Sequence, residues 1–174
     1  VPNNVTLTIA GDFDIKQAKE WVNKYFGEIK RGEEISKIEK QLVTLSSTKK
    51  LYYEDNFASV PFLMVAWPGV YQYHPDAYAL EVLSTYLTKG KKAPLYQVLV
   101  EDKQLTDQVV AYQDNGEIAG QLVMQVTAFQ DKSLQDVMDV MQAGFAKFEA
   151  NGISANDLAR IKAGQETAFY NSLS

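Results

Sequence analysis

Alternating apolar and polar residues open the chain and predict a strand followed by a helix. Val5, Leu7 and Ile9 alternate with threonines, which is the period-two pattern of a half-buried strand. Asp14 suits the N-cap of the helix that follows, and a glycine is placed to end it. The apolar residues that recur in this helix at helical spacing are Ile15, Ala18, Val22, Tyr25, Phe26 and Ile29. Residues 1–29 are therefore predicted to form an opening strand and helix.

A polar connector, residues 30–50, separates this opening from the rest of the chain. Two strand-like stretches follow it, residues 51–54 and 60–67. The second is almost continuously apolar, which predicts a central strand covered on both faces. His74 and Pro75 then suit the cap and first turn of a helix. The predicted buried side of this helix consists of Ala79, Val82, Leu83, Tyr86 and Leu87.

A short helix, a hairpin and two long helices are predicted in the remainder of the chain. Pro94 lies near the start of the short helix. Residues 108–113 and 120–129 are strand-like, and an Asn-Gly pair in their connection is typical of a hairpin. Ser133 and Ser154 suit the N-caps of the last two helices. Their predicted apolar stripes are Leu134, Val137, Met138, Met141, Phe145 and Phe148 in the first, and Leu158, Ile161 and Phe169 in the second.

The order of predicted elements favours the α+β class, with a mostly antiparallel sheet and helices layered on one face. A length of 174 residues and a hydrophobic content of 46% suit a single domain with a filled core. We therefore expect residues 1–174 to form one domain, in which residues 51–174 supply the remainder of the sheet and helices. The chain has no initiator Met and stops within a helical pattern, which predicts a piece excised from a larger protein.

Charge and composition exclude several classes of function. The net charge of -5 argues against a nucleic-acid surface, which needs a basic face to neutralise phosphates. No apolar run is long enough to predict insertion into a membrane. The absence of cysteine excludes a disulfide framework and fits the cytosol and the bacterial periplasm equally well.

The metal chemistry of the chain is limited by its single histidine, His74. A catalytic zinc usually takes three ligands from His, Cys and carboxylates, and the H-x-x-E-H motif alone needs two histidines. The sequence therefore predicts no catalytic residue, no metal ligand and no cofactor in this chain. We interpret His74 as the residue that begins a helix, and Lys91 and Lys92 as a solvated loop that lacks the glycine spacing of a phosphate loop.

A series of short motifs resembles the pitrilysin/insulinase family of zinc metallopeptidases along nearly the whole chain. In chain order they are residues 1–4 (VPNN), 9–14 (IAGDFD), 24–27 (KYFG) and 90–96 (GKKAPLY), followed by Arg160, Ile161, Lys162, Glu166, Phe169 and Tyr170. The last two motifs are similar to the long bacterial members, in which two homologous halves lie in one chain. Each half of such a member is a pair of similar domains of the fold expected here, which mitochondrial processing peptidase shares.

The resemblance implies a position and a role in the parent protein. The chain is similar to the second, "inactive" domain of the first half, and H-x-x-E-H lies in the domain before it. The implied function is a non-catalytic domain of a peptide-degrading zinc metalloendopeptidase, which forms part of the wall of an enclosed substrate chamber and supports the catalytic domain. The implied partners are the catalytic domain and the second half of the same chain, and peptide substrates. Zinc is expected in the catalytic domain, and the bacterial periplasm is the implied location.

The resemblance also marks two groups of site residues. The loop at residues 89–94 falls where mitochondrial processing peptidase carries a longer glycine-rich loop linked with substrate handling. It supplies the candidate chamber residues Lys89, Gly90, Lys91, Lys92 and Tyr96. In the last domain of family members an Arg and a Tyr reach the active site and hydrogen-bond the substrate carbonyl. The matching positions here are Val100 and Asp107, which offer no such donors, and this departure fits a domain that does not face the zinc.

Two other classes of function stay open from the sequence. One is a structural domain of a family member that has lost catalysis, and the residues upstream of this chain would decide by showing or lacking H-x-x-E-H. The other is a stand-alone module that lays a peptide along an exposed sheet edge. Titration of the chain with peptides separates the second class from a domain that depends on its parent.

Overall fold

A computed structural model describes residues 1–173 of the chain. They fall into two compact units, and the boundary between them, at Glu39 and Lys40, lies within the predicted polar connector.

The first unit contains a short 3-10 helix, η1 (Pro2–Asn4), and the helix α1 (Ile15–Phe26). Asp14 caps α1 as predicted, because its carboxylate accepts a hydrogen bond from the backbone N–H of Gln17 at 2.7 Å. The side chain of Asn3 holds the unit together: it donates to the carbonyl of Glu33 at 2.8 Å and accepts from the N–H of Gly32 at 3.0 Å.

The strand predicted at residues 5–9 does not form. The segment has no ladder partner within its unit, and its alternating side chains Val5, Leu7 and Ile9 are exposed. A strand stabilises itself only through pairing with a neighbour, so an alternating pattern without a partner remains irregular backbone. The prediction at residues 51–54 is wrong for the same reason, and Leu51 there is 99% exposed.

The second unit is built on a three-stranded antiparallel sheet with the order β1-β3-β2. The strands are β1 (Phe62–Gly69), β2 (Thr106–Asn115) and β3 (Gly120–Ala128). The predicted hairpin is confirmed by the pairing of β2 with β3. The prediction of a central strand at residues 60–67 is wrong, because β1 lies at an edge and β3 is central. Phe62 and Met64 on its outer face are 49% and 54% exposed, so a continuous apolar run did not mean burial on both faces.

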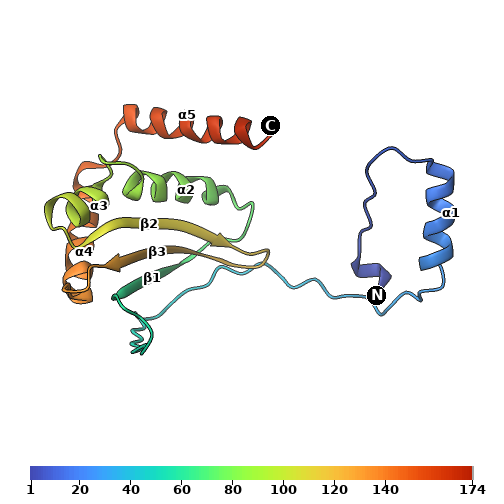
Figure 1. Ribbon diagram of the computed structural model, residues 1–174, viewed down its shortest axis with the longest axis horizontal. Helices are drawn as coiled ribbons and strands as arrows, with labels where there is room; N and C mark the ends of the chain where they lie inside the picture. The colour runs from blue at the N-terminus through green and yellow to red at the C-terminus, as the bar shows by residue number, and fades with distance from the viewer. Residues whose placement is uncertain (174) are drawn as a thin grey trace. The chain divides into compact units, whose positions relative to one another are not determined.

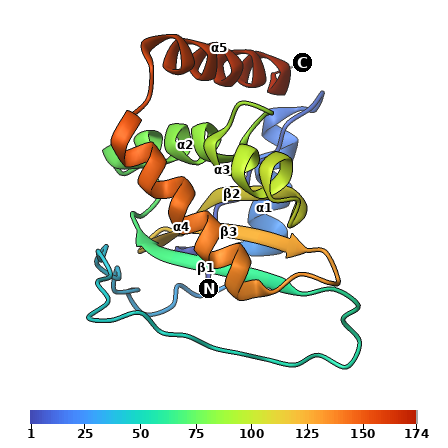
Figure 2. The ribbon, with the colours of Figure 1, turned by 90° about the vertical axis from the view of Figure 1, so that its left-hand side faces the viewer.

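Helices cover one face of this sheet, which confirms the predicted α+β class (Figure 1). They are α2 (Pro75–Thr88), α3 (Pro94–Tyr96), the π-helical turn η2 (Gln97–Asp102), α4 (Leu134–Asn151) and α5 (Ala155–Ser172). Figure 2 shows α4 running diagonally across the sheet, where it contacts β1 and β3. α5 packs on α2, on the side away from the strands (Figure 1).

The core lies between the sheet and these helices. Its most buried side chains are Leu87, Leu95, Leu99, Met124, Val126, Val137 and Met141. The predicted stripe of α4 is confirmed, since each of its members is buried or packs against this core. Two predictions of helix faces are corrected: Ala79 of α2 and Phe169 of α5 are exposed. Ser84 and Thr88 are buried in α2, where their hydroxyls donate to the carbonyls of Glu81 and Ser84.

Candidate functional site

The lysine-bearing loop between α2 and α3 is a tight, exposed turn. Gly90 has φ 93°, a backbone conformation that residues with a side chain rarely adopt, and the N–H of Ala93 closes the turn on the carbonyl of Gly90 at 2.9 Å. Ala93 is buried and anchors the loop to the core, whereas Lys89, Lys91 and Lys92 are exposed. The loop therefore exposes its lysine ammonium groups to solvent, while the turn and the buried Ala93 hold its backbone in place.

Tyr96, the remaining residue of the candidate loop site, packs on the core instead of extending beside the lysines. The structure instead brings the loop close to the start of α5. The hydroxyl of Ser154 chiefly, and then Arg160 and Lys92, hold the pKa of the Asp157 carboxyl below its usual range. The loop also contacts the start of η2, because the side-chain amide of Gln97 donates to the carbonyl of Lys91.

Val100 and Asp107 line one open surface hollow of about 570 Å³ at the start of β2. The structure thus brings the two predicted positions together, although neither offers a donor to a substrate carbonyl. The other residues that line the hollow are Lys103, Gln104, Thr106, Phe129, Asp131 and Lys132.

Charges of both signs surround this hollow. Asp131 and Lys132 pair at 2.9 Å, and this hydrogen bond lowers the pKa of the Asp131 carboxyl. Lys103 and Asp107 are exposed, and within the described part of the chain neither makes an ion pair. The hollow therefore carries one cation and one anion that no protein group neutralises.

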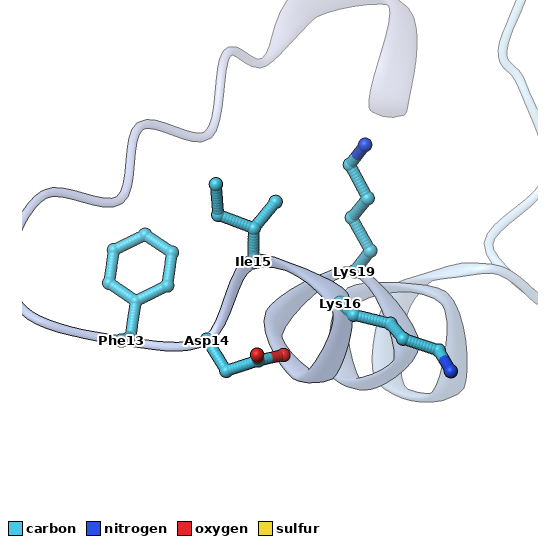
Figure 3. A pocket seen from close by; sticks show the side chains of 5 residues that line it. All are labelled: Phe13, Asp14, Ile15, Lys16 and Lys19. Atoms are coloured by element: carbon cyan, nitrogen blue, oxygen red, sulfur yellow. The ribbon is translucent and has the colours of Figure 1, made fainter.

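A second hollow, of about 590 Å³, lies at the start of α1 in the first unit. In Figure 3 Phe13, Ile15 and Lys19 point to one side of the chain, whereas Asp14 and Lys16 point away from them. The carboxylate of Asp14 is already used to cap α1. This hollow lacks a set of convergent polar groups and includes none of the predicted site residues.

His74 occupies the N-cap of α2, as predicted. Its Nδ1 accepts from the N–H of Asp76 at 3.1 Å, and its ring packs edge-on against Tyr71 with centroids 4.9 Å apart. Among residues 1–173 no group of three or more His, Asp or Glu side chains is arranged to hold a metal ion. The described residues therefore do not fit the zinc ion that the resemblance implies for the parent. No helix among them has the length and apolarity needed to cross a membrane.

Sequence patterns alone do not indicate most of the residues around the hollow at β2. Lys103, Gln104, Phe129, Asp131 and Lys132 come from segments that lie apart in the sequence. Their only local signal is the irregular, polar composition before β2 and after β3. Their approach depends on the antiparallel pairing of these strands, which places the start of β2 beside the end of β3.

Comparison with family models decides the family. The model described as the peptidase M16 inactive domain matches residues 1–165. The chain belongs to the peptidase M16 inactive-domain family. The resemblance to the pitrilysin/insulinase metallopeptidases is thereby confirmed. Comparison with curated proteins gives no match.

Solved structures share the fold of this M16 domain. A protease from Helicobacter pylori matches with a TM-score of 0.70 and 18% identity over 94% of this chain and 40% of its own. The M16 inactive domain from Pseudomonas fluorescens matches with a TM-score of 0.63 and 20% identity, over 90% and 37%. The inactive peptidase domain of a candidate zinc protease from Bordetella parapertussis matches with 0.58 and 17%, over 67% and 64%. The chain thus spans well under half of the Helicobacter pylori protease.

Proposed function

We propose that this M16 domain is the non-catalytic partner of a zinc-bearing domain in the same parent chain, and that it forms part of the wall of a closed peptide chamber. The observation that carries the proposal is the family match over residues 1–165, and it is supported by the finding that no three His, Asp or Glu side chains among the described residues are grouped as metal ligands. The Bordetella parapertussis relative, described as the inactive domain of a candidate zinc protease, supports the same division of labour.

The physical role of such a wall is to exclude water and to position an extended peptide. A chamber wall must be rigid. The sheet and its helical layer meet this requirement, because Leu95, Leu99 and Val137 of the helices are fully buried in the core. The exposed lysines of the loop at residues 89–92 are the part of this domain that we assign to the chamber lining. Peptide substrates are then selected by size and by charge at this surface.

Removal of this domain from the parent protein tests the proposal. The catalytic domain alone is expected to retain zinc but to lose most of its cleavage of a quenched-fluorescence peptide, because it no longer encloses the substrate. Addition of the separate 174-residue chain in trans is the matched control and is expected to restore part of the activity. Undiminished cleavage by the catalytic domain alone would overturn the proposal.

A second candidate function rests on the free edge of β1. This strand has no neighbour on its outer side within the described residues, and a peptide could add to it as a further strand. Peptide titration of the unaltered chain and of its Met64→Pro variant distinguishes the two functions. Saturable binding that Met64→Pro abolishes without unfolding the chain would favour a peptide-binding module, since proline removes a donor from the strand.

A further inference from the structure

The hollow at the start of β2 is surrounded by irregular backbone. η2 is π-helical and is closed by a hydrogen bond from the N–H of Lys103 to the carbonyl of Val98 at 3.2 Å. Gln104 has φ 49°, in the left-handed region that non-glycine residues rarely occupy, and β2 has a register shift between Thr106 and Val109. Each of these features costs free energy, and each is over-represented at functional sites. Their concentration at one place points to a binding role.

Backbone hydrogen bonds fix the walls of the hollow. The N–H of Leu105 donates to the carbonyl of Leu99, and the N–H of Phe129 donates to the carbonyl of Leu105, each at 2.9 Å. The N–H of Lys132 continues the series to the carbonyl of Phe129, also at 2.9 Å. The hydroxyl of Thr106, which is buried, donates to the carbonyl of Thr127 at 2.6 Å and ties β2 to β3. The hollow is therefore preformed, and a ligand would spend little free energy on ordering it.

The side chains define the chemistry of the ligand. Val100 and Phe129, which is 42% exposed, give the hollow an apolar surface. Asp131 and Lys132 neutralise each other, so the groups left for a ligand are the ammonium of Lys103 and the carboxylate of Asp107. A simple anion would be attracted by Lys103 and repelled by Asp107, and a simple cation would meet the reverse. A ligand with both charges and an apolar part between them uses every one of these groups.

We propose that this hollow binds a short peptide with free ends. Lys103 binds its terminal carboxylate, Asp107 binds its terminal ammonium, and Val100 and Phe129 contact an apolar side chain between the two. The volume of about 570 Å³ lies within the range of ~300–1,000 Å³ that is typical of small-ligand sites. The site would recognise the short peptides that proteolysis releases. It does not depend on the domain's forming a chamber wall.

Calorimetric titration of the 174-residue chain with the tripeptide Gly-Leu-Gly tests this proposal. The same tripeptide with an amidated carboxyl end or an acetylated amino end removes one charge at a time. We expect Lys103→Met to weaken binding of the free tripeptide about tenfold, in the range of a lost charge-assisted hydrogen bond. Amidation should weaken binding to the unaltered chain equally and should have no further effect on Lys103→Met. Acetylation should likewise weaken binding to the unaltered chain as much as Asp107→Asn does, and it should have no further effect on Asp107→Asn.

The matched controls remove exposed charges at the ends of α4 and of the β2–β3 hairpin that lie away from the hollow. Lys147→Met lies near the far end of α4, and Glu117→Gln lies in the turn at the far end of the β2–β3 hairpin. Both should bind the tripeptide as the unaltered chain does, and circular dichroism should show all variants folded. Absence of saturable binding at millimolar tripeptide would overturn the proposal. Equal binding of blocked and free tripeptides, or equal losses in the control variants, would do so as well.

Discussion

Trp67 of β1 and Phe145 of α4 meet edge to face, with ring centroids 5.8 Å apart and planes at 88°. This contact joins an edge strand of the sheet to the helix that crosses it (Figure 2). Aromatic pairs prefer this geometry and stabilise a core beyond the area they bury. The contact lies on the inner face of β1, where Leu63 and Val65 also pack on the core.

Truncation of this pair should destabilise the domain strongly. We expect Phe145→Ala to lower the free energy of unfolding by about 3 kcal/mol, the lower end of the range for aromatic side chains in cores, because Phe145 is half-buried. Chemical denaturation measures the change. Phe169→Ala is the matched control, since Phe169 is exposed on α5, and it should change stability by less than about 0.5 kcal/mol. A loss below ~1 kcal/mol for Phe145→Ala would contradict the packing of α4 on the sheet.

Gly144 should not tolerate a side chain. A Cβ atom placed there would lie 2.5 Å from Cδ2 of Leu95 and 3.2 Å from Cγ2 of Val98, and Leu95 is fully buried. We expect Gly144→Ala to cost ~1–3 kcal/mol through overpacking, as measured by thermal or chemical unfolding. Gly164 of α5 is the matched control, because a Cβ there meets no atom within 4 Å. Gly164→Ala should stabilise the chain by ~0.5–1 kcal/mol. Equal effects of both changes would contradict the close approach of α4 to α3.

The start of α5 should be acid-sensitive. The hydroxyl of Ser154 donates to the Asp157 carboxylate at 2.7 Å, Arg160 adds a contact at 3.2 Å, and together they lower the pKa of Asp157 from its ordinary value of 3.8. A carboxyl with a lowered pKa in the folded state contributes stability above its unfolded pKa, and this contribution disappears as the pH falls through the folded pKa. Asp157→Asn should therefore reduce the loss of melting temperature between about pH 6 and about pH 3. Glu117→Gln is the control, and an unchanged acid response in Asp157→Asn would contradict the assignment.

Local chemistry was enough to predict the helix starts. Asp14, His74, Ser133 and Ser154 each accept a hydrogen bond from a backbone N–H in the first turn of the helix they cap, as expected from residue type and spacing. A cap is made by residues a few positions apart, so a sequence window contains all of its parts. The hairpin was predictable for the same reason.

Pairing over long distances in the sequence was not predictable in this way. The alternation at Val5, Leu7 and Ile9 describes a surface that fits a sheet, but it does not supply the neighbouring strand. The apolar run of β1 likewise fits a central strand and an edge strand, and only the order β1-β3-β2 decides. The hollow forms through the pairing of β2 with β3 and the left-handed backbone at Gln104. Glutamine is not a residue type that predicts left-handed backbone, so the sequence contains no sign of this turn.

Substitution of Val100 distinguishes a structural role of this domain from a catalytic role in the parent protein. The residue is half-buried in η2 and has no hydrogen-bond donor on its side chain. Val100→Ala should lower the melting temperature but leave kcat/KM within about threefold, far from the ~100-fold loss that follows removal of an oxyanion donor. Steady-state kinetics of the folded variant check this. A large fall in kcat at full folding would place this domain at the scissile bond.

Zinc content is the sharpest test of where the catalytic chemistry lies, because we assign the metal to a domain outside this chain. Metal analysis should find no stoichiometric zinc in the purified 174-residue chain, which should cleave no quenched-fluorescence peptide. The same chain preceded by the domain expected to carry H-x-x-E-H should hold one zinc per molecule and cleave the peptide. One tightly bound zinc per 174-residue chain would contradict this assignment.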